Sequence, residues 1–178
     1  MPGPNILSHI VFRTSRTDEM VEWYKSVTRS SIVFRNPKAC FLSFDDEHHR
    51  IGFIATPELS EQTRSQAGLE HVAFRFTALP ELLDAYAELR DTGIVPWRCT
   101  NHGPTTSFYY IDPDQNHVEL LYDNLDTAET EVFMGSAEFR ANPMGLSFDP
   151  DHLLRCAKAG VPLSRLIAYE PLPPCEGE

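Results

Sequence analysis

The sequence is short of basic residues, and this shortage excludes several classes of partner. Its 178 residues include 15 lysines and arginines against 26 aspartates and glutamates, which gives a formal net charge of −11. A chain this acidic is repelled by the phosphate backbone of nucleic acids and by anionic membrane surfaces. We therefore predict no nucleic-acid partner and no membrane partner.

Long apolar runs are also missing. No stretch approaches the roughly 18 consecutive apolar residues that are typical of a membrane-spanning helix. The first residues, "MPGPNILSHIVF", lack a basic segment followed by an apolar one. We therefore expect no signal peptide and a cytoplasmic location.

Cysteines are few, and their spacing is irregular. The four cysteines show no C-x-x-C pair; they are Cys40, Cys99, Cys156 and Cys175. Scattered cysteines of this kind favour free thiols in a reducing compartment over a disulfide framework or a zinc site.

What the sequence does contain is an internal repeat. "LSHIVFRT" at residues 7–14 and "LEHVAFRF" at residues 69–76 share the pattern L-x-H-[IV]-[VA]-F-R, and both suit a β-strand. A helical pattern follows each strand, with Thr17 and Thr77 as candidate N-caps. Three strand-like runs follow each helix. The predicted helices are residues 18–26 and 79–92, and the runs are residues 31–34, 39–44 and 50–55, then 94–99, 106–111 and 117–122.

The repeat predicts an α+β fold built from two βαβββ modules. We place the modules at about residues 5–56 and 68–124, joined by a polar linker, so that residues 1–124 form one paired domain. Residues 125–178 form a C-terminal extension that packs on this domain. In the extension we expect a loop-like stretch, a short helix over residues 150–160 and a disordered tail.

Metal-type residues recur at matching positions of the repeat. His9 lies in the first strand of one module, and His71 holds the same position in the other. Glu119 lies in the last strand of the second module, inside the apolar run "HVELLYD". Each residue alone fits a structural role. Together they form a 2-His-1-carboxylate set, which suits a divalent metal with open positions, above all Fe(II).

The chain resembles the vicinal oxygen chelate superfamily, whose members pair βαβββ modules into an open eight-stranded, barrel-like metal cleft. Within it, the residues most resemble type I extradiol ring-cleaving dioxygenases, the kind that cleaves biphenyl-2,3-diol. The resemblance implies that His9, His71 and Glu119 bind Fe(II), with Mn(II) or another divalent metal as the alternative.

The resemblance also implies three further residues of the site. "HHRIGF" matches a paired histidine motif whose second member is the family's acid–base residue, which here is His49. Because side chains alternate along a strand, we expect His48 to face away from His49. Tyr109 matches the family's tyrosine ten residues before the ligand glutamate, and His102 is the candidate for an additional histidine.

Comparison of the two copies predicts the number of metal ligands. An ungapped match of "DEHHRIGF" to "DQNHVELL" sets Ile51 against Glu119. Isoleucine cannot bind a metal, so three protein ligands leave about half of an octahedral sphere open for a catecholate and O2.

The function predicted from the sequence is Fe(II)-dependent cleavage of a catechol-type ring with O2. The expected partners are a small aromatic diol, O2 and a second copy of the chain, in a homodimer or a larger homo-oligomer. Two alternatives remain on the same fold: a divalent-metal isomerase or lyase of the glyoxalase type, and a drug-sequestering binding protein.

Overall fold

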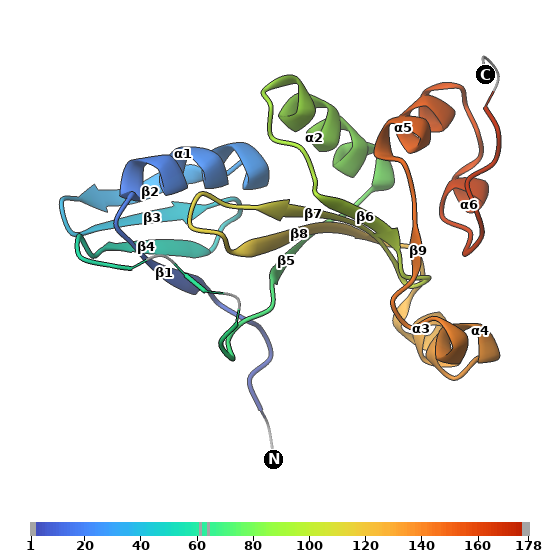
Figure 1. The fold of residues 1–178 in the computed structure, drawn as a ribbon, viewed down its shortest axis with the longest axis horizontal. Helices are drawn as coiled ribbons and strands as arrows, with labels where there is room; N and C mark the ends of the chain where they lie inside the picture. The colour runs from blue at the N-terminus through green and yellow to red at the C-terminus, as the bar shows by residue number, and fades with distance from the viewer. Residues whose placement is uncertain (1–2, 61, 64, 176–178) are drawn as a thin grey trace. The chain divides into compact units, whose positions relative to one another are not determined.

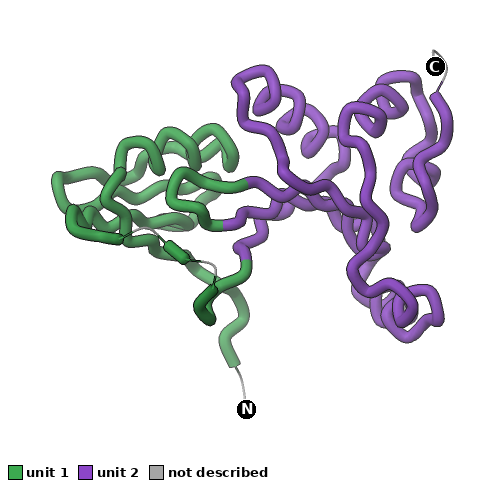
Figure 2. Tube along the Cα trace, viewed as in Figure 1, with its two compact units in different colours: residues 1–70, 111–116 green, residues 71–110, 117–178 purple. Residues whose placement is uncertain are grey.

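The computed structural model describes residues 3–60, 62–63 and 65–175. The chain forms two compact units (Figure 2). Unit 1 comprises Met1–Glu70 and Ile111–Asn116, and unit 2 comprises His71–Tyr110 and His117–Glu178. Unit 2 therefore contains most of the second module together with the extension.

Unit 1 contains a four-stranded sheet with one helix on one face (Figure 1). The strand order is β1-β4-β3-β2, with β1 parallel to β4. The helix buries four apolar residues at helical spacing, among them Met20 and Tyr24, and ends where Arg29 adopts a left-handed conformation. The elements are β1 (Ile10–Thr14), α1 (Thr17–Thr28), β2 (Ser31–Asn36), β3 (Ala39–Ser43) and β4 (Ile51–Ala55).

Unit 2 repeats this arrangement and adds an edge strand. Its sheet has the order β5-β8-β7-β6-β9, and β5 is parallel to β8. Helix α2 buries an apolar face that includes Leu82, Leu83 and Tyr86. The elements are β5 (Val72–Phe76), α2 (Leu79–Asp91), β6 (Arg98–Asn101), β7 (Thr105–Ile111) and β8 (His117–Asp123). The two βαβββ modules are confirmed.

The extension is more regular than the sequence predicts. We expected one helix and a loop, yet the stretch contributes a strand that pairs antiparallel with β6 and several short helices. Short helices with weak periodicity are hard to detect in a sequence. The elements are α3 (Thr127–Met134), α4 (Ala137–Ala141), β9 (Leu146–Ser147), α5 (Pro150–Lys158) and α6 (Leu163–Leu166).

Both predicted helix caps were wrong by one residue. Thr17 is the first helical residue of α1, and the N-cap is Arg16. In α2 the N-cap is Ala78, because the Thr77 hydroxyl donates to the Glu81 carboxylate at 2.8 Å instead of capping the backbone. Pro80 lies in the first turn of α2, where its missing N–H costs nothing.

The turn between β7 and β8 is organised around a buried carboxylate. Asp112 is 1% exposed and accepts hydrogen bonds from the Asp114 and Asn116 backbone N–H groups, from the Asn116 amide and from the Tyr24 hydroxyl. Burial raises the pKa of Asp112, and the bonds from Asn116 and Tyr24 oppose that rise. Asp112 therefore organises this turn through local hydrogen bonds.

The prediction of four free thiols was wrong for two of them. Cys156 and Cys175 form a disulfide, whereas Cys40 and Cys99 are free and buried. The pairing was missed because the tail was expected to be disordered. Residues 170–175 are placed by the structure, and residues 176–178 lie outside the described part of the chain. Among the described helices, none is long and apolar enough to cross a membrane.

Candidate functional site

A buried carboxylate and an imidazole meet on the open face of the unit 2 sheet. His71 immediately precedes β5, and Glu119 lies in β8 opposite Ala73. Because side chains alternate, Val118 and Leu120 are buried while Glu119 points to the other face. Its Oε2 lies 3.0 Å from Nε2 of His71, and the residue is 5% exposed. The strand register therefore brings together two of the predicted ligands.

Tyr109 and His102 complete this cluster from β7 and from the loop after β6. Nε2 of His102 lies 2.9 Å from the Tyr109 hydroxyl, and the rings of His71 and Tyr109 meet edge to face at 5.6 Å. Burial raises the pKa of Tyr109, and the charge of Glu119 and a hydrogen bond to its carboxylate raise it further. Tyr109 therefore keeps its proton, and its hydroxyl forms a hydrogen bond with Nε2 of His102.

The extension supports the loop that carries His102. Gly103 has φ +89°, and a Cβ there would lie 2.2 Å from the Phe133 ring of α3. The Asn124 amide donates to the Gly103 carbonyl at 2.9 Å, and the Asn101 amide donates to the Ala168 carbonyl at 2.9 Å. The position of His102 thus depends on residues outside the repeat.

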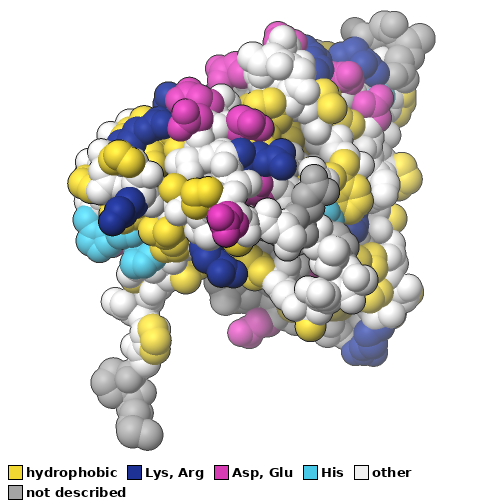
Figure 3. Space-filling view, turned by 60° about the vertical axis from the view of Figure 1, so that its left-hand side comes forward, with side chains coloured by type: hydrophobic (Ala, Val, Ile, Leu, Met, Phe, Trp, Pro, Cys, Tyr) yellow, Lys and Arg dark blue, Asp and Glu magenta, His cyan; other side chains and the backbone are white. Residues whose placement is uncertain are grey.

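Unit 1 contains a second cluster, made of three histidines. Ring nitrogens of His9, His48 and His49 all lie within 4.8 Å of one another. The rings of His9 and His49 stack at 4.3 Å, and Phe41 stacks on His49 at 4.7 Å. Figure 3 shows histidine side chains exposed beside hydrophobic ones on one face of the molecule. The structure thus brings together two predicted site residues, His9 and His49, with a third that was not predicted.

Residues 6–120 match the family described as the Glyoxalase/Bleomycin resistance protein/Dioxygenase superfamily. The chain belongs to this superfamily. It is 40% identical to "Biphenyl-2,3-diol 1,2-dioxygenase 2" of Rhodococcus globerulus over 91% of this chain and 86% of that protein. It is 44% identical to "Biphenyl-2,3-diol 1,2-dioxygenase 3" of the same organism over 90% of this chain and 86% of that protein.

Solved structures agree with this fold. A fosfomycin resistance protein, FosX, from Listeria monocytogenes matches with a TM-score of 0.56 and 17% identity, covering 72% of this chain and 99% of that one. At this identity the likeness shows the superfamily fold alone.

The strand register corrects the predicted equivalence within the superfamily repeat. In unit 2, Ala73 pairs with Glu119, whereas in unit 1 its counterpart Val11 pairs with Gly52. Gly52, and not Ile51, therefore occupies the position of Glu119. The ungapped sequence match was off by one residue because the bends before β4 and β8 differ. Glycine offers no ligand either, so the first module supplies no carboxylate at this position.

The expectation that His48 and His49 face opposite ways was also wrong. It assumed a strand, yet β4 begins only at Ile51, and both histidines lie in the bend before it. Their Nδ1 atoms lie 2.6 Å apart, so one nitrogen donates and the other accepts. Burial, followed by the charges of His9 and His48, lowers the pKa of His49.

Two aromatic residues near Tyr109 in the sequence divide between core and surface. Tyr110 is fully buried, whereas Trp97 is half exposed and its ring centroid lies 5.0 Å from that of His117. Trp97 also lies 6.3 Å from the Tyr109 ring. A planar apolar surface therefore adjoins the Tyr109 cluster on the open face of unit 2.

The stability of the metal-free protein is expected to fall as the pH drops from about 7.5 to about 5.5. Burial lowers the pKa of His102 below its ordinary value of about 6.5. As the pH falls, His102 therefore binds a proton in the unfolded chain before it does so in the folded protein. The stabilisation present above pH 6.5 is lost as the pH falls toward the pKa of His102 in the folded state. Urea unfolding at both pH values should show a smaller difference in His102→Gln than in the wild type. An identical difference in both proteins would contradict the assignment.

Proposed function

We propose that this chain is an Fe(II)-dependent extradiol dioxygenase that cleaves the ring of a catechol-type aromatic with O2. One observation carries the proposal: the buried Glu119 carboxylate lies 3.0 Å from His71, whose ring meets the Tyr109 ring edge to face. The identity of 40% and 44% to two proteins named biphenyl-2,3-diol 1,2-dioxygenases supports an aromatic diol as the substrate class.

The metal ligands in this proposal are His9, His71 and Glu119. The donor set fits a divalent transition metal, because it joins imidazole nitrogens to a carboxylate. The buried Glu119 also fits, since a carboxylate removed from water needs a positive partner. The assignment of His9 as a ligand rests on its position in the repeat. Like His71, it immediately precedes the first strand of its module. A bound Fe(II) would supply the electron transfer between diol and O2, and Mn(II) is the alternative.

The remaining residues of the site would handle protons and orientation. Tyr109 presents a hydroxyl that stays protonated, because burial and Glu119 hold its pKa well above the ordinary value. It can therefore donate a hydrogen bond to a substrate oxygen. His102, within 2.9 Å, fixes the direction of that hydroxyl. His49 would accept a proton from the diol, since its lowered pKa keeps the ring neutral near pH 7.

Tyr109→Phe is expected to lower kcat about 10- to 100-fold with little change in bound metal, the range typical of partners that surround a ligand. The substitution keeps the ring beside His71 and removes only the hydroxyl. Steady-state oxygen uptake and metal analysis of the same sample measure both quantities. Wild-type kcat in the variant would remove Tyr109 from the mechanism.

The experiment that tests the function is oxygen uptake by protein loaded with Fe(II) under anaerobic conditions. A panel of catechols that includes biphenyl-2,3-diol should produce stoichiometric O2 consumption and a ring-opened product. Turnover of another substrate without O2 would favour an isomerase or lyase. Retention of an aromatic ligand by a protein that binds no metal would favour a binding protein.

We also propose that the protein is cytoplasmic and forms a homodimer or a larger homo-oligomer. Exposed apolar side chains on β2, namely Ile32, Val33 and Phe34, support self-association. Light scattering coupled to size-exclusion chromatography measures the assembly, and a monomer at micromolar concentration would contradict the proposal.

A further inference from the structure

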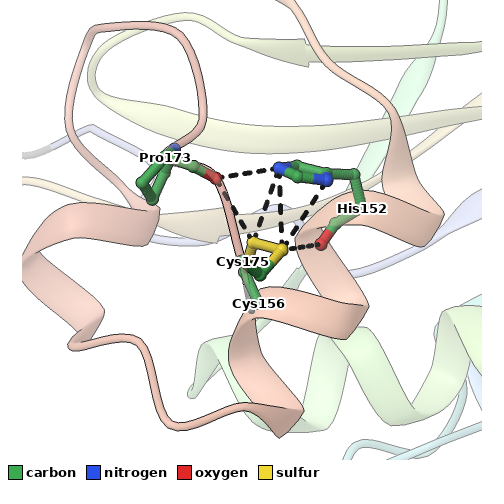
Figure 4. Close-up of a disulfide and its surroundings, with 4 residues drawn as sticks. All are labelled: His152, Cys156, Pro173 and Cys175. Carbon is green, nitrogen blue, oxygen red and sulfur yellow. Dashed lines mark hydrogen bonds between the residues drawn. A yellow bond between two sulfur atoms is a disulfide. The ribbon is translucent and has the colours of Figure 1, made fainter. Parts of the chain in front are cut away.

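Three metal-binding side chains converge at the C-terminal end of unit 2, away from the residues assigned above. His152 and Cys156 lie four residues apart on α5, so they share one face of the helix. Cys175 reaches the same point from the irregular segment after α6 (Figure 4). The ligand atoms of all three lie within 4.8 Å of one another.

The imidazole nitrogen Nε2 of His152 is the centre of this cluster. It lies 3.5 Å from Sγ of Cys156, 3.8 Å from Sγ of Cys175 and 2.9 Å from the Pro173 carbonyl oxygen. A carbonyl only accepts, so Nε2 carries the proton in the disulfide form. One nitrogen, two sulfurs and one oxygen thus border a common space, as Figure 4 shows.

These distances match the edges of a tetrahedral zinc site. With Zn–N of about 2.05 Å and Zn–S of about 2.3 Å, a tetrahedron places nitrogen and sulfur about 3.6 Å apart. The observed separations of 3.5 and 3.8 Å fall on either side of that value. Cys156 is fully buried and Cys175 is 8% exposed, so two thiolates here would need a cation to offset their charge.

We propose that reduction of the Cys156–Cys175 disulfide creates a metal site in which His152 and both thiolates bind zinc or a similar soft divalent cation. The Pro173 carbonyl or a water completes four-coordination. A phosphine reductant and water convert the disulfide into two thiols and a phosphine oxide. The cation then binds both sulfurs and releases two protons, while the His152 proton moves from Nε2 to Nδ1.

The site would hold the final segment of the chain against α5. That segment also contacts the sheet, because the Asn101 amide donates to the Ile167 and Ala168 carbonyls. Asn101 is the residue before His102. A cation at Cys175 would therefore stabilise the segment that braces β6.

Cobalt(II) is the probe that distinguishes this site from the one proposed for catalysis. Reduced full-length protein titrated anaerobically with Co²⁺ should develop thiolate-to-cobalt charge-transfer absorption that saturates at one equivalent and disappears when Zn²⁺ is added. His9, His71 and Glu119 contain no sulfur, so cobalt bound there gives no such band. The oxidised protein should show none, because its sulfurs are bonded to each other.

Matched variants assign the band to residues. Cys175→Ser and Cys156→Ser should abolish it, and His152→Asn should weaken and shift it. Cys40→Ser, which removes a free buried thiol elsewhere, should leave it unchanged. Circular dichroism verifies the fold of each variant. Cys175 lies near the end of the chain, so Cys175→Ser tests the site even if Cys156→Ser fails to fold. Absence of the band in reduced wild type, or its persistence in Cys175→Ser, would overturn the proposal.

Discussion

Glu119→Gln is expected to lower catechol-dependent oxygen uptake well over 100-fold. Substitution of a residue that hydrogen-bonds a metal ligand already lowers metal affinity or activity about 10- to 100-fold. Glu119 is proposed as a ligand itself, so the expected loss is larger. Glutamine keeps the size of the side chain in β8 and removes the charge that faces His71 at 3.0 Å. The measurement is oxygen uptake at saturating diol, paired with iron analysis of the desalted protein, in which bound iron should fall in parallel.

Glu58→Gln is the matched control, since the same substitution is made at an exposed position. It should retain wild-type uptake and iron content. If Glu119→Gln kept its iron and its rate, Glu119 would be a structural residue, and the metal ligands would have to be sought elsewhere. If it kept iron and lost only rate, Glu119 would act on the substrate instead.

Asp112→Ala is expected to lower the free energy of unfolding by about 2–4 kcal/mol. The carboxylate accepts four hydrogen bonds in a buried turn, and its removal leaves donors from Asn116 and Tyr24 without an acceptor. The side chain is 1% exposed, so water cannot easily replace it. Urea unfolding followed by circular dichroism measures the change.

Two further variants make the Asp112 test specific. Asp112→Asn keeps one accepting oxygen and should lose less stability than the alanine variant. Asp46→Ala removes an exposed acid from another bend and should change stability by no more than about 0.5 kcal/mol. Equal stability of Asp112→Ala and Asp46→Ala would mean that the turn reorganises around the missing carboxylate.

The sequence was sufficient to predict the repeated module. The same L-x-H pattern immediately precedes strands β1 and β5, and the alternation of buried and exposed residues along both strands follows from the strand period. His71 and Glu119 could be grouped because the pairing of β5 with β8 is a property of the module, whereas Tyr109 was placed beside them by the family resemblance. The clustering of His102 with Tyr109 followed from the family resemblance.

Irregular segments were where prediction failed. His48 and His49 lie in a bend, so the strand rule that separates neighbouring side chains does not apply to them. Because of the same bend, the ungapped sequence match set Ile51 against Glu119, although Gly52 occupies the equivalent position in the strand register. Cys156 and Cys175 are 19 residues apart, and only the path of the chain after α6 brings them together. Such paths depend on tertiary contacts that no local pattern encodes.

Gly52 makes the two copies of the module unequal in a way that bears on how the protein could evolve. Both copies keep the same strand pairing, but only one has an acidic side chain where the other has a hydrogen atom. A Cβ at Gly52 would lie 3.2 Å from Val11, whose side chain is half exposed and has room to turn. One codon change at this position could therefore add a donor group to the first copy while the second continued to work. The repeated module therefore leaves position 52 available for a second metal-binding side chain. A substitution there could give a related enzyme that catalyses a different reaction.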